Sequence, residues 1–146
     1  MEEAIQKLER YLNLTESYFI NATPIEINFK ASESKWSKKE ILGHLIDSGI
    51  NNLQRFTEIQ FEEKPYSIRK YNQDALVLTN DYQHSDLLEL IGFWESINKR
   101  IITIMQLQTI ETLRYEIKLD GEYNNLKFLM TDYVEHLKHH INQIVN

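Results

Sequence analysis

Four stretches of this sequence carry apolar residues at a spacing of three or four positions, which is the period of one face of an α-helix. They run from about residue 2 to 19, 37 to 59, 85 to 105 and 126 to 144. Each stretch has a polar opposite face, and none is apolar all round. Because amphipathic helices of this kind cover their apolar faces by packing together, the pattern predicts an all-α fold, a four-helix bundle.

Start and stop signals bound these stretches. Ser37 followed by Glu40 forms a capping box, and Asp86 followed by Glu89 repeats the same spacing before the third stretch. Pro24 ends any continuation of the first stretch, since proline disfavours the helical conformation in the residue before it. The fourth helix is expected to begin after Asn125.

Two connections between the predicted helices are not simple loops. Residues 62–84 hold Pro65 and a candidate short helix at 72–77, and connections of this length are usually functional or partly helical. Between the third and fourth helices, apolar and charged residues alternate over 113–119 before Asp120-Gly121. Alternation followed by a turn sequence predicts a short hairpin on the side of the bundle.

The bulk composition predicts one soluble, fully folded domain over residues 1–146. Apolar residues make up 42% and charged residues 26%, and only four Gly and two Pro are present, which leaves little room for linkers or disorder. The net charge of −6 would repel phosphate backbones and anionic membranes, so we expect no nucleic-acid and no membrane partner. The N-terminus is acidic and amphipathic, and no apolar run approaches the ~18 residues of a membrane span. A cytoplasmic protein is therefore the expectation.

Cysteine is absent from the chain. That absence removes disulfides, thiolate metal ligands and a cysteine nucleophile together. Any thiol chemistry must use a thiol that a substrate brings. Gly-rich phosphate loops, GxSxG and HExxH are absent as well, so the corresponding nucleotide, hydrolase-elbow and zincin mechanisms are unsupported.

Histidines interrupt the edges of two apolar faces. His136 and His140 lie one turn apart on the flank of the fourth helix, whereas His139 falls on its solvent face. Two imidazoles at positions i and i+4 can reach one ion. Alone, such a pair is more often a set of surface or capping histidines, whose charge the helix dipole favours.

A third histidine, His44, lies on the flank of the second helix's apolar face. By itself it would more often be a satisfied core residue. Burying an imidazole without a hydrogen-bond partner or metal would cost about 1–3 kcal/mol of stability for each of the three residues. Because the three lie on the edges of two helices that can face each other, a shared ion is favoured as their partner. Three imidazoles leave open positions for water or substrate, as in catalytic sites. Zinc, nickel, iron, cobalt and manganese all remain open as the divalent ion.

Polar residues near His44 complete the candidate site. Asp47 lies one turn beyond it, and is either an acceptor behind an imidazole or a substrate-facing base, or simply a solvated helix carboxylate. Asn51 and Arg55 continue a polar seam along the same helix, and we expect them to line the pocket together with Tyr133. The other tyrosines and both tryptophans are expected in the core or at the pocket mouth.

Two segments resemble a known family. The first, WSKKEILGHLIDS over residues 36–48, resembles the W-S-x-x-E-x-x-x-H-L-x-D-S segment of the DinB/YfiT-like superfamily. The second, DYVEHLKHHINQI over residues 132–144, resembles its closing H-x-x-H-H segment, and YNQDALV at 71–77 with Tyr82 looks like its middle connection. The resemblance covers nearly the whole chain.

This resemblance implies an up-down-down-up bundle whose metal is held by His44, His136 and His140, the residues that the helical faces also select. Characterised relatives include transferases of low-molecular-weight thiols, a thiol-dependent isomerase and hydrolases, and several form homodimers. The family therefore implies a small-molecule substrate, a thiol co-substrate or a hydrolytic variant, and a homodimer.

Two functions of different classes follow. In the first, a metal-dependent transferase deprotonates a small thiol and presents it to an electrophile, or a related hydrolase activates water instead. In the second, a non-catalytic bundle binds a ligand or partner, and the histidines serve as a stabilising clip. One fold hosts many activities, so the open metal coordination, not the fold, favours the enzyme.

Overall fold

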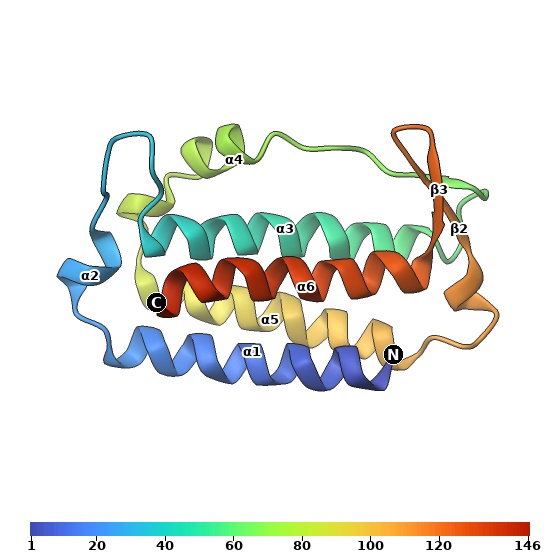
Figure 1. The fold of residues 1–146 in the computed structure, drawn as a ribbon, viewed down its shortest axis with the longest axis horizontal. Helices are drawn as coiled ribbons and strands as arrows, with labels where there is room; N and C mark the ends of the chain where they lie inside the picture. Colours follow the sequence, from blue (N-terminus) through green and yellow to red (C-terminus); the bar gives the residue numbers. More distant parts are fainter.

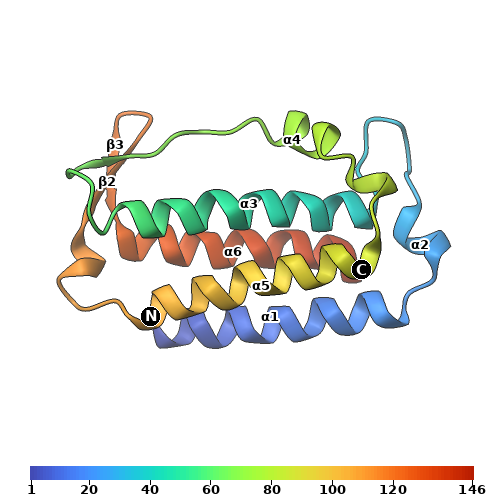
Figure 2. The same ribbon diagram turned by 180° about the vertical axis from the view of Figure 1, so that it is seen from behind.

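The computed structural model describes residues 1–146. Four long helices form the bundle: α1 (Glu2–Asn21), α3 (Lys38–Glu58), α5 (Leu87–Gln106) and α6 (Leu126–Val145). Each of α1 and α3 packs against both α5 and α6, so α1 and α3 lie on one diagonal of the bundle and α5 and α6 on the other. Figures 1 and 2 show the four helices lying lengthwise beside one another from opposite sides.

The helices run up, down, down and up along the chain. In Figure 1, α1 and α6 run from the right end of the bundle to the left, and α3 and α5 run from left to right. Because α3 and α5 run in the same direction, the chain must return along the whole bundle between them. That return explains the length of the connection over residues 59–86, which passes along α3 and contains α4 (Gln73–Thr79) and the short 3₁₀ helix η1 (Tyr82–His84).

The predicted helix boundaries are confirmed closely. Ser37 and Glu40 form the reciprocal capping box at the start of α3, and Asp86 and Asn125 cap α5 and α6 through their side chains. The candidate helix at 72–77 is α4, with Asn72 as its cap. Each cap satisfies backbone N–H groups that the first turn of a helix leaves free.

One helix was missed from the sequence. Pro24 was expected only to end α1, yet it also opens α2 (Pro24–Asn28). Proline suits the first position of a helix, where its missing N–H would have no partner. Thr23 and Glu26 form a capping box around it, which is the signal that could have revealed this turn.

A small sheet closes one end of the bundle. The predicted hairpin is β2 (Glu116–Leu119) and β3 (Glu122–Asn125), paired antiparallel so that Leu119 faces Glu122 across the Asp120-Gly121 turn. Both turn residues have positive φ, 53° and 87°, which Asp and Gly tolerate best. β1 (Tyr66–Ser67) adds to the other side of β2 in parallel and anchors the long connection there. The short 3₁₀ helix η2 (Thr112–Arg114) precedes the hairpin in the chain.

The core of the bundle is one continuous cluster of buried apolar side chains from all four long helices. Trp94, Phe56 and Met130 are among its largest fully buried members. None of the helices combines the length and apolar character that a membrane crossing requires.

Candidate metal centre

The three predicted histidines meet between α3 and α6. His44 lies two turns into α3 and is fully buried, and His136 and His140 are half-buried on the facing side of α6. The Nε2 atoms of His44 and His136 are 3.2 Å apart. One ring nitrogen from each of the three residues lies within 4.8 Å of the others. The packing of α3 on α6 therefore brings together residues separated by 92 positions in the sequence.

The outer nitrogens of the two α6 imidazoles have partners. Ser48 Oγ lies 3.4 Å from His136 Nδ1, and Gln143 Oε1 lies 2.9 Å from His140 Nδ1. An Nδ1–H that donates to these oxygens leaves each Nε2 without a proton and free to bind an ion. His44 Nδ1 is buried without a hydrogen-bond partner, and the ring of Trp36 lies over this imidazole at 4.9 Å between centroids.

The surroundings keep the imidazoles neutral. Burial lowers the pKa of His44 to about 3 and the pKa of His136 to about 4, and the charges of neighbouring histidines lower both further. Burial also lowers the pKa of His140. A neutral imidazole has a free lone pair, which is the form that binds a metal ion.

The cluster fits a divalent transition metal. Two nitrogens about 2.05 Å from one tetrahedral ion would lie roughly 3.3 Å apart, close to the 3.2 Å between His44 and His136. The largest separation in the set is wider, so binding would draw the imidazoles closer together. Neutral nitrogen donors with no carboxylate or thiolate among them suit several divalent transition metals, zinc, nickel and iron among them, so the donor set leaves the identity of the ion open.

Solved structures share this architecture. YfiT from Bacillus subtilis, described as "a probable metal-dependent hydrolase with an unusual four-helix bundle topology", superposes with a TM-score of 0.87 at 23% identity, covering 98% of this chain and 82% of that one. The chain has the DinB/YfiT-like fold. A DinB-like protein of Bacillus subtilis, YjoA, matches with a TM-score of 0.67 at 16% identity over 97% of this chain and 86% of that one.

The solved structures confirm the fold that the DinB/YfiT-like resemblance implied, and the sequence comparison finds a relative as well. A Bacillus pumilus protein named "Putative metal-dependent hydrolase" is 30% identical over 111 residues, which are 75% of this chain and 62% of that protein. The match thus spans less than two thirds of that relative's length. No family model matches the sequence.

The structure places Asp47 in a role that the sequence did not suggest. It is only 3% exposed, so it is not a solvated helix carboxylate. Its Oδ1 accepts hydrogen bonds from the Tyr82 hydroxyl at 2.7 Å and the Asn80 amide at 2.9 Å, and none of its hydrogen bonds involves a histidine. Burial raises the pKa of Asp47, although both hydrogen bonds favour its charged form. In this DinB/YfiT-like bundle, Asp47 ties the returning connection to α3.

The three expected pocket residues separate in the structure. Asn51 and Arg55 line a large cavity between α3 and the returning connection. Tyr133 does not join them, because it is 2% exposed in the core and donates its hydroxyl to Asn98 Oδ1 at 2.7 Å. Burial raises the pKa of this tyrosine above its usual range. Tyr133 therefore belongs to the apolar face of α6 that packs into the core, and it does not line the pocket.

Two residues around the histidines, Ser48 and Gln143, were not singled out from the sequence, and Trp36 was expected only in the core or at the pocket mouth. Ser48 follows His44 by one turn and Gln143 follows His140 by nearly one turn, so helical spacing could have suggested that they share the same faces. Trp36 precedes the α3 cap, and its contact with His44 depends on how the chain enters the helix. That entry angle is a tertiary feature that the spacing of residues does not contain.

Proposed function

We propose that this chain is a metal-dependent enzyme that acts on a small molecule, with hydrolysis as its reaction class. The observation that carries the proposal is the convergence of His44, His136 and His140, whose ligand nitrogens lie within 4.8 Å of one another. Three protein ligands leave coordination positions free, which distinguishes catalytic from closed structural sites. The names of the Bacillus subtilis and Bacillus pumilus relatives support the same class of reaction.

An opening gives access to this cluster from outside. A cavity of about 380 Å³ is bounded by the segment before α3, the first turn of α4 and the end of α6. Its lining residues include Trp36, Asp74, His140 and Gln143. A ligand in this opening would therefore touch a metal-binding imidazole, with the indole of Trp36 as an apolar wall and the Asp74 carboxylate as a proton acceptor.

Residues around the three histidines fix the orientation of their imidazoles and limit the access of water. Ser48 and Gln143 orient the α6 imidazoles, and Trp36 shields His44 from water on one side. A divalent ion held by these residues would supply a nucleophile at neutral pH, because it lowers the pKa of a bound water or thiol. An alternative within the same site is transfer of a low-molecular-weight thiol, which the chain, lacking cysteine, could only receive from outside.

Hydrolysis and thiol transfer are separated by a paired assay. The purified protein, loaded with zinc or manganese, is tested for hydrolysis of nitrophenyl esters and anilides. The same protein is tested for release of halide from a dinitrophenyl halide with and without added cysteine. We expect ester or anilide turnover without thiol, and loss of that turnover in His44→Ala.

The control is His139→Ala, which removes the exposed histidine next to His140 and should keep full activity. Halide release that depends on cysteine, with no ester or anilide turnover, would replace hydrolysis by thiol transfer. Metal binding without either reaction would contradict the enzyme and favour the non-catalytic bundle, in which the ion only stabilises the fold. The expected homodimer stays a prediction, tested by the mass of the protein in solution.

A further inference from the structure

A cavity larger than the opening beside His140 lies away from the histidines. It occupies about 1020 Å³ between the second half of α3 and the connection that returns along it, up to α4. This volume is large enough for a small organic molecule. Its lining has aromatic and small apolar side chains beside three cationic and three acidic ones: Arg55, Arg69, Lys70, Glu58, Glu62 and Glu63.

Arg55 is the half-buried cation of this cavity. Its Nη2 donates to the carbonyl of Arg69 at 2.6 Å, and its Nη1 lies 3.4 Å from Asn52 Oδ1. Its guanidinium also lies over the ring of Tyr71, 5.4 Å from the centroid. A guanidinium carries five N–H donors in a planar fork, so most of its donors have no protein acceptor.

No carboxylate neutralises Arg55, since none of the ion pairs in the structure includes it. The carboxylate of Glu58, one turn away, accepts hydrogen bonds from Tyr66 at 2.6 Å and from Gln54 at 2.7 Å. Burial lowers the pKa of Arg55, in keeping with a cation that has lost part of its hydration. Partly buried charges are normally paired, and here the missing partner is an anion.

We propose that this cavity binds a small organic carboxylate, with the Arg55 guanidinium as its anchor. The planar fork of arginine matches a carboxylate in two parallel hydrogen bonds. Tyr71 beside it, with Ala75 and Leu76 across the cavity, provides aromatic and apolar surface for the body of the ligand.

This site is separate from the metal centre. Arg55 follows His44 by eleven residues, which is about 16 Å along a helix at 1.5 Å per residue. A carboxylate held by Arg55 is therefore not a ligand of an ion held by the histidines, and the site does not depend on the proposed metal chemistry.

The test uses benzoate as the probe, because it joins a carboxylate to an aromatic body. Its binding to the purified protein is measured by calorimetry at constant ionic strength, beside benzamide and inorganic phosphate. We expect saturable benzoate binding with a dissociation constant of about 1 mM, and no binding of benzamide. Arg55→Gln should weaken benzoate binding at least about tenfold, as loss of a charge-assisted bidentate pair, and Arg55→Lys should weaken it less.

Two control variants show whether an effect is specific to Arg55. Arg100→Gln removes an exposed arginine on α5, and His44→Ala removes a histidine of the metal centre; both should bind benzoate as the wild type does. The proposal is overturned if the wild type shows no saturable binding, if phosphate binds more tightly than benzoate, or if Arg55→Gln has no effect. It is also overturned if Arg100→Gln or His44→Ala weakens binding as much as Arg55→Gln.

Discussion

Gly43, the residue before His44, matters because it has no Cβ. A Cβ built at this position would lie 2.1 Å from Cδ2 and 2.2 Å from Cγ of the Tyr82 ring. The missing side chain lets Tyr82 lie flat against α3, where its hydroxyl reaches Asp47. One small residue thus permits the contact that fastens the returning connection beside the histidines.

Gly43→Ala should therefore destabilise the protein. Alanine improves the helix propensity by about 1 kcal/mol, but displacement of the Tyr82 ring costs about 1–3 kcal/mol and also strains its hydrogen bond. We expect a net loss of about 1–2 kcal/mol in the free energy of unfolding, measured by urea denaturation. Gly92→Ala is the matched control: nothing lies within 4 Å of its added methyl group, so this variant should gain up to about 1 kcal/mol. Equal effects at the two glycines would contradict the packing role.

The raised pKa of Asp47 predicts how the stability of the protein depends on pH. Its pKa in the folded protein is raised, chiefly by burial, so the folded state keeps this proton at pH values where the unfolded chain has lost it. The stability that the protonated carboxyl contributes is then lost as the pH rises from about 3.9 through the folded-state pKa. Over that range, the free energy of unfolding of the wild type should fall relative to that of Asp47→Asn. Above the folded-state pKa, the difference between the two proteins should stay constant. Urea denaturation of both proteins from about pH 4 to 8 measures the difference, and a relative gain for the wild type would show that the pKa is lowered instead.

At the residue scale, the histidines could be predicted because the periodicity of a helix places them on its faces. The role of Asp47 could not, since its partners Asn80 and Tyr82 follow it by 33 and 35 positions. Their approach depends on a connection whose path the sequence pattern leaves open. Tyr133 was expected at the pocket, and its place could not be predicted for a related reason: the partner of its hydroxyl, Asn98, precedes it by 35 positions on α5 and binds it within the core.

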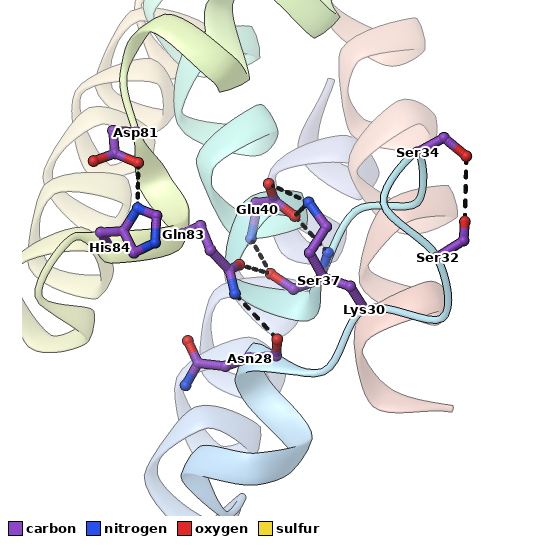
Figure 3. A network of polar contacts seen from close by, with 9 residues as sticks. All are labelled: Asn28, Lys30, Ser32, Ser34, Ser37, Glu40, Asp81, Gln83 and His84. Carbon is purple, nitrogen blue, oxygen red and sulfur yellow. Dashed lines mark hydrogen bonds and ion pairs between the residues drawn. The ribbon is translucent and has the colours of Figure 1, made fainter.

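At the scale of elements, the start of α3 is the point where three segments are joined. Figure 3 shows Ser37 and Glu40 of the capping box with their partners: Ser37 donates to Gln83 of η1 at 2.6 Å, and Lys30 pairs with Glu40 at 2.7 Å. Gln83 in turn donates to the carbonyl of Asn28 at the end of α2. The cap therefore fixes the first turns of α3, on which His44 lies, to both neighbouring connections.

Ser37→Ala should cost more than loss of an ordinary helix cap. Caps typically contribute about 1 kcal/mol and reach about 2, and here the fully buried hydroxyl also serves Gln83. We expect a loss of about 2 kcal/mol in the free energy of unfolding. Thr23→Ala, which removes the exposed cap of the single turn α2, should cost about 1 kcal/mol or less. If the two losses are equal, the link from Ser37 to Gln83 adds nothing to stability.

Most elements could be predicted because their signals are local. Capping residues, apolar spacing and the Asp120-Gly121 turn lie within a few positions of the structures they specify. The strand β1 could not be predicted, because a two-residue strand has no pattern of its own and forms only by pairing with β2, about 50 residues later. Its formation is a consequence of how the returning connection meets the hairpin.

At the scale of the whole molecule, the up-down-down-up topology sets up both proposed sites. Because α3 and α6 run antiparallel and pack together, His44 near the start of one helix meets two histidines near the end of the other. Because α3 and α5 are parallel, the connection between them must run back beside α3, and the cavity that holds Arg55 lies beneath it.

Removal of the metal should lower the stability of the whole protein. An ion that binds only the folded state adds about 2.7 kcal/mol at a free concentration one hundred times its dissociation constant. We expect a chelator to lower the melting temperature of protein purified without a nickel column, and added zinc or manganese to restore it. In His44→Ala, chelation should leave the melting temperature unchanged. If neither the chelator nor the added metal changes the melting temperature of the wild type, no bound ion stabilises the folded protein.

Metal affinity in single-histidine variants is the most direct measurement of the central claim, that three imidazoles from α3 and α6 hold one ion. Groups that merely orient metal ligands already contribute about 10–100-fold to affinity, so loss of a ligand should cost at least about a hundredfold. Titration of the chelated protein with zinc should show one ion per chain in the wild type and in His139→Ala, and affinity reduced to that extent in His44→Ala, His136→Ala and His140→Ala. Unchanged affinity in those three variants, or an equal loss in His139→Ala, would contradict the account.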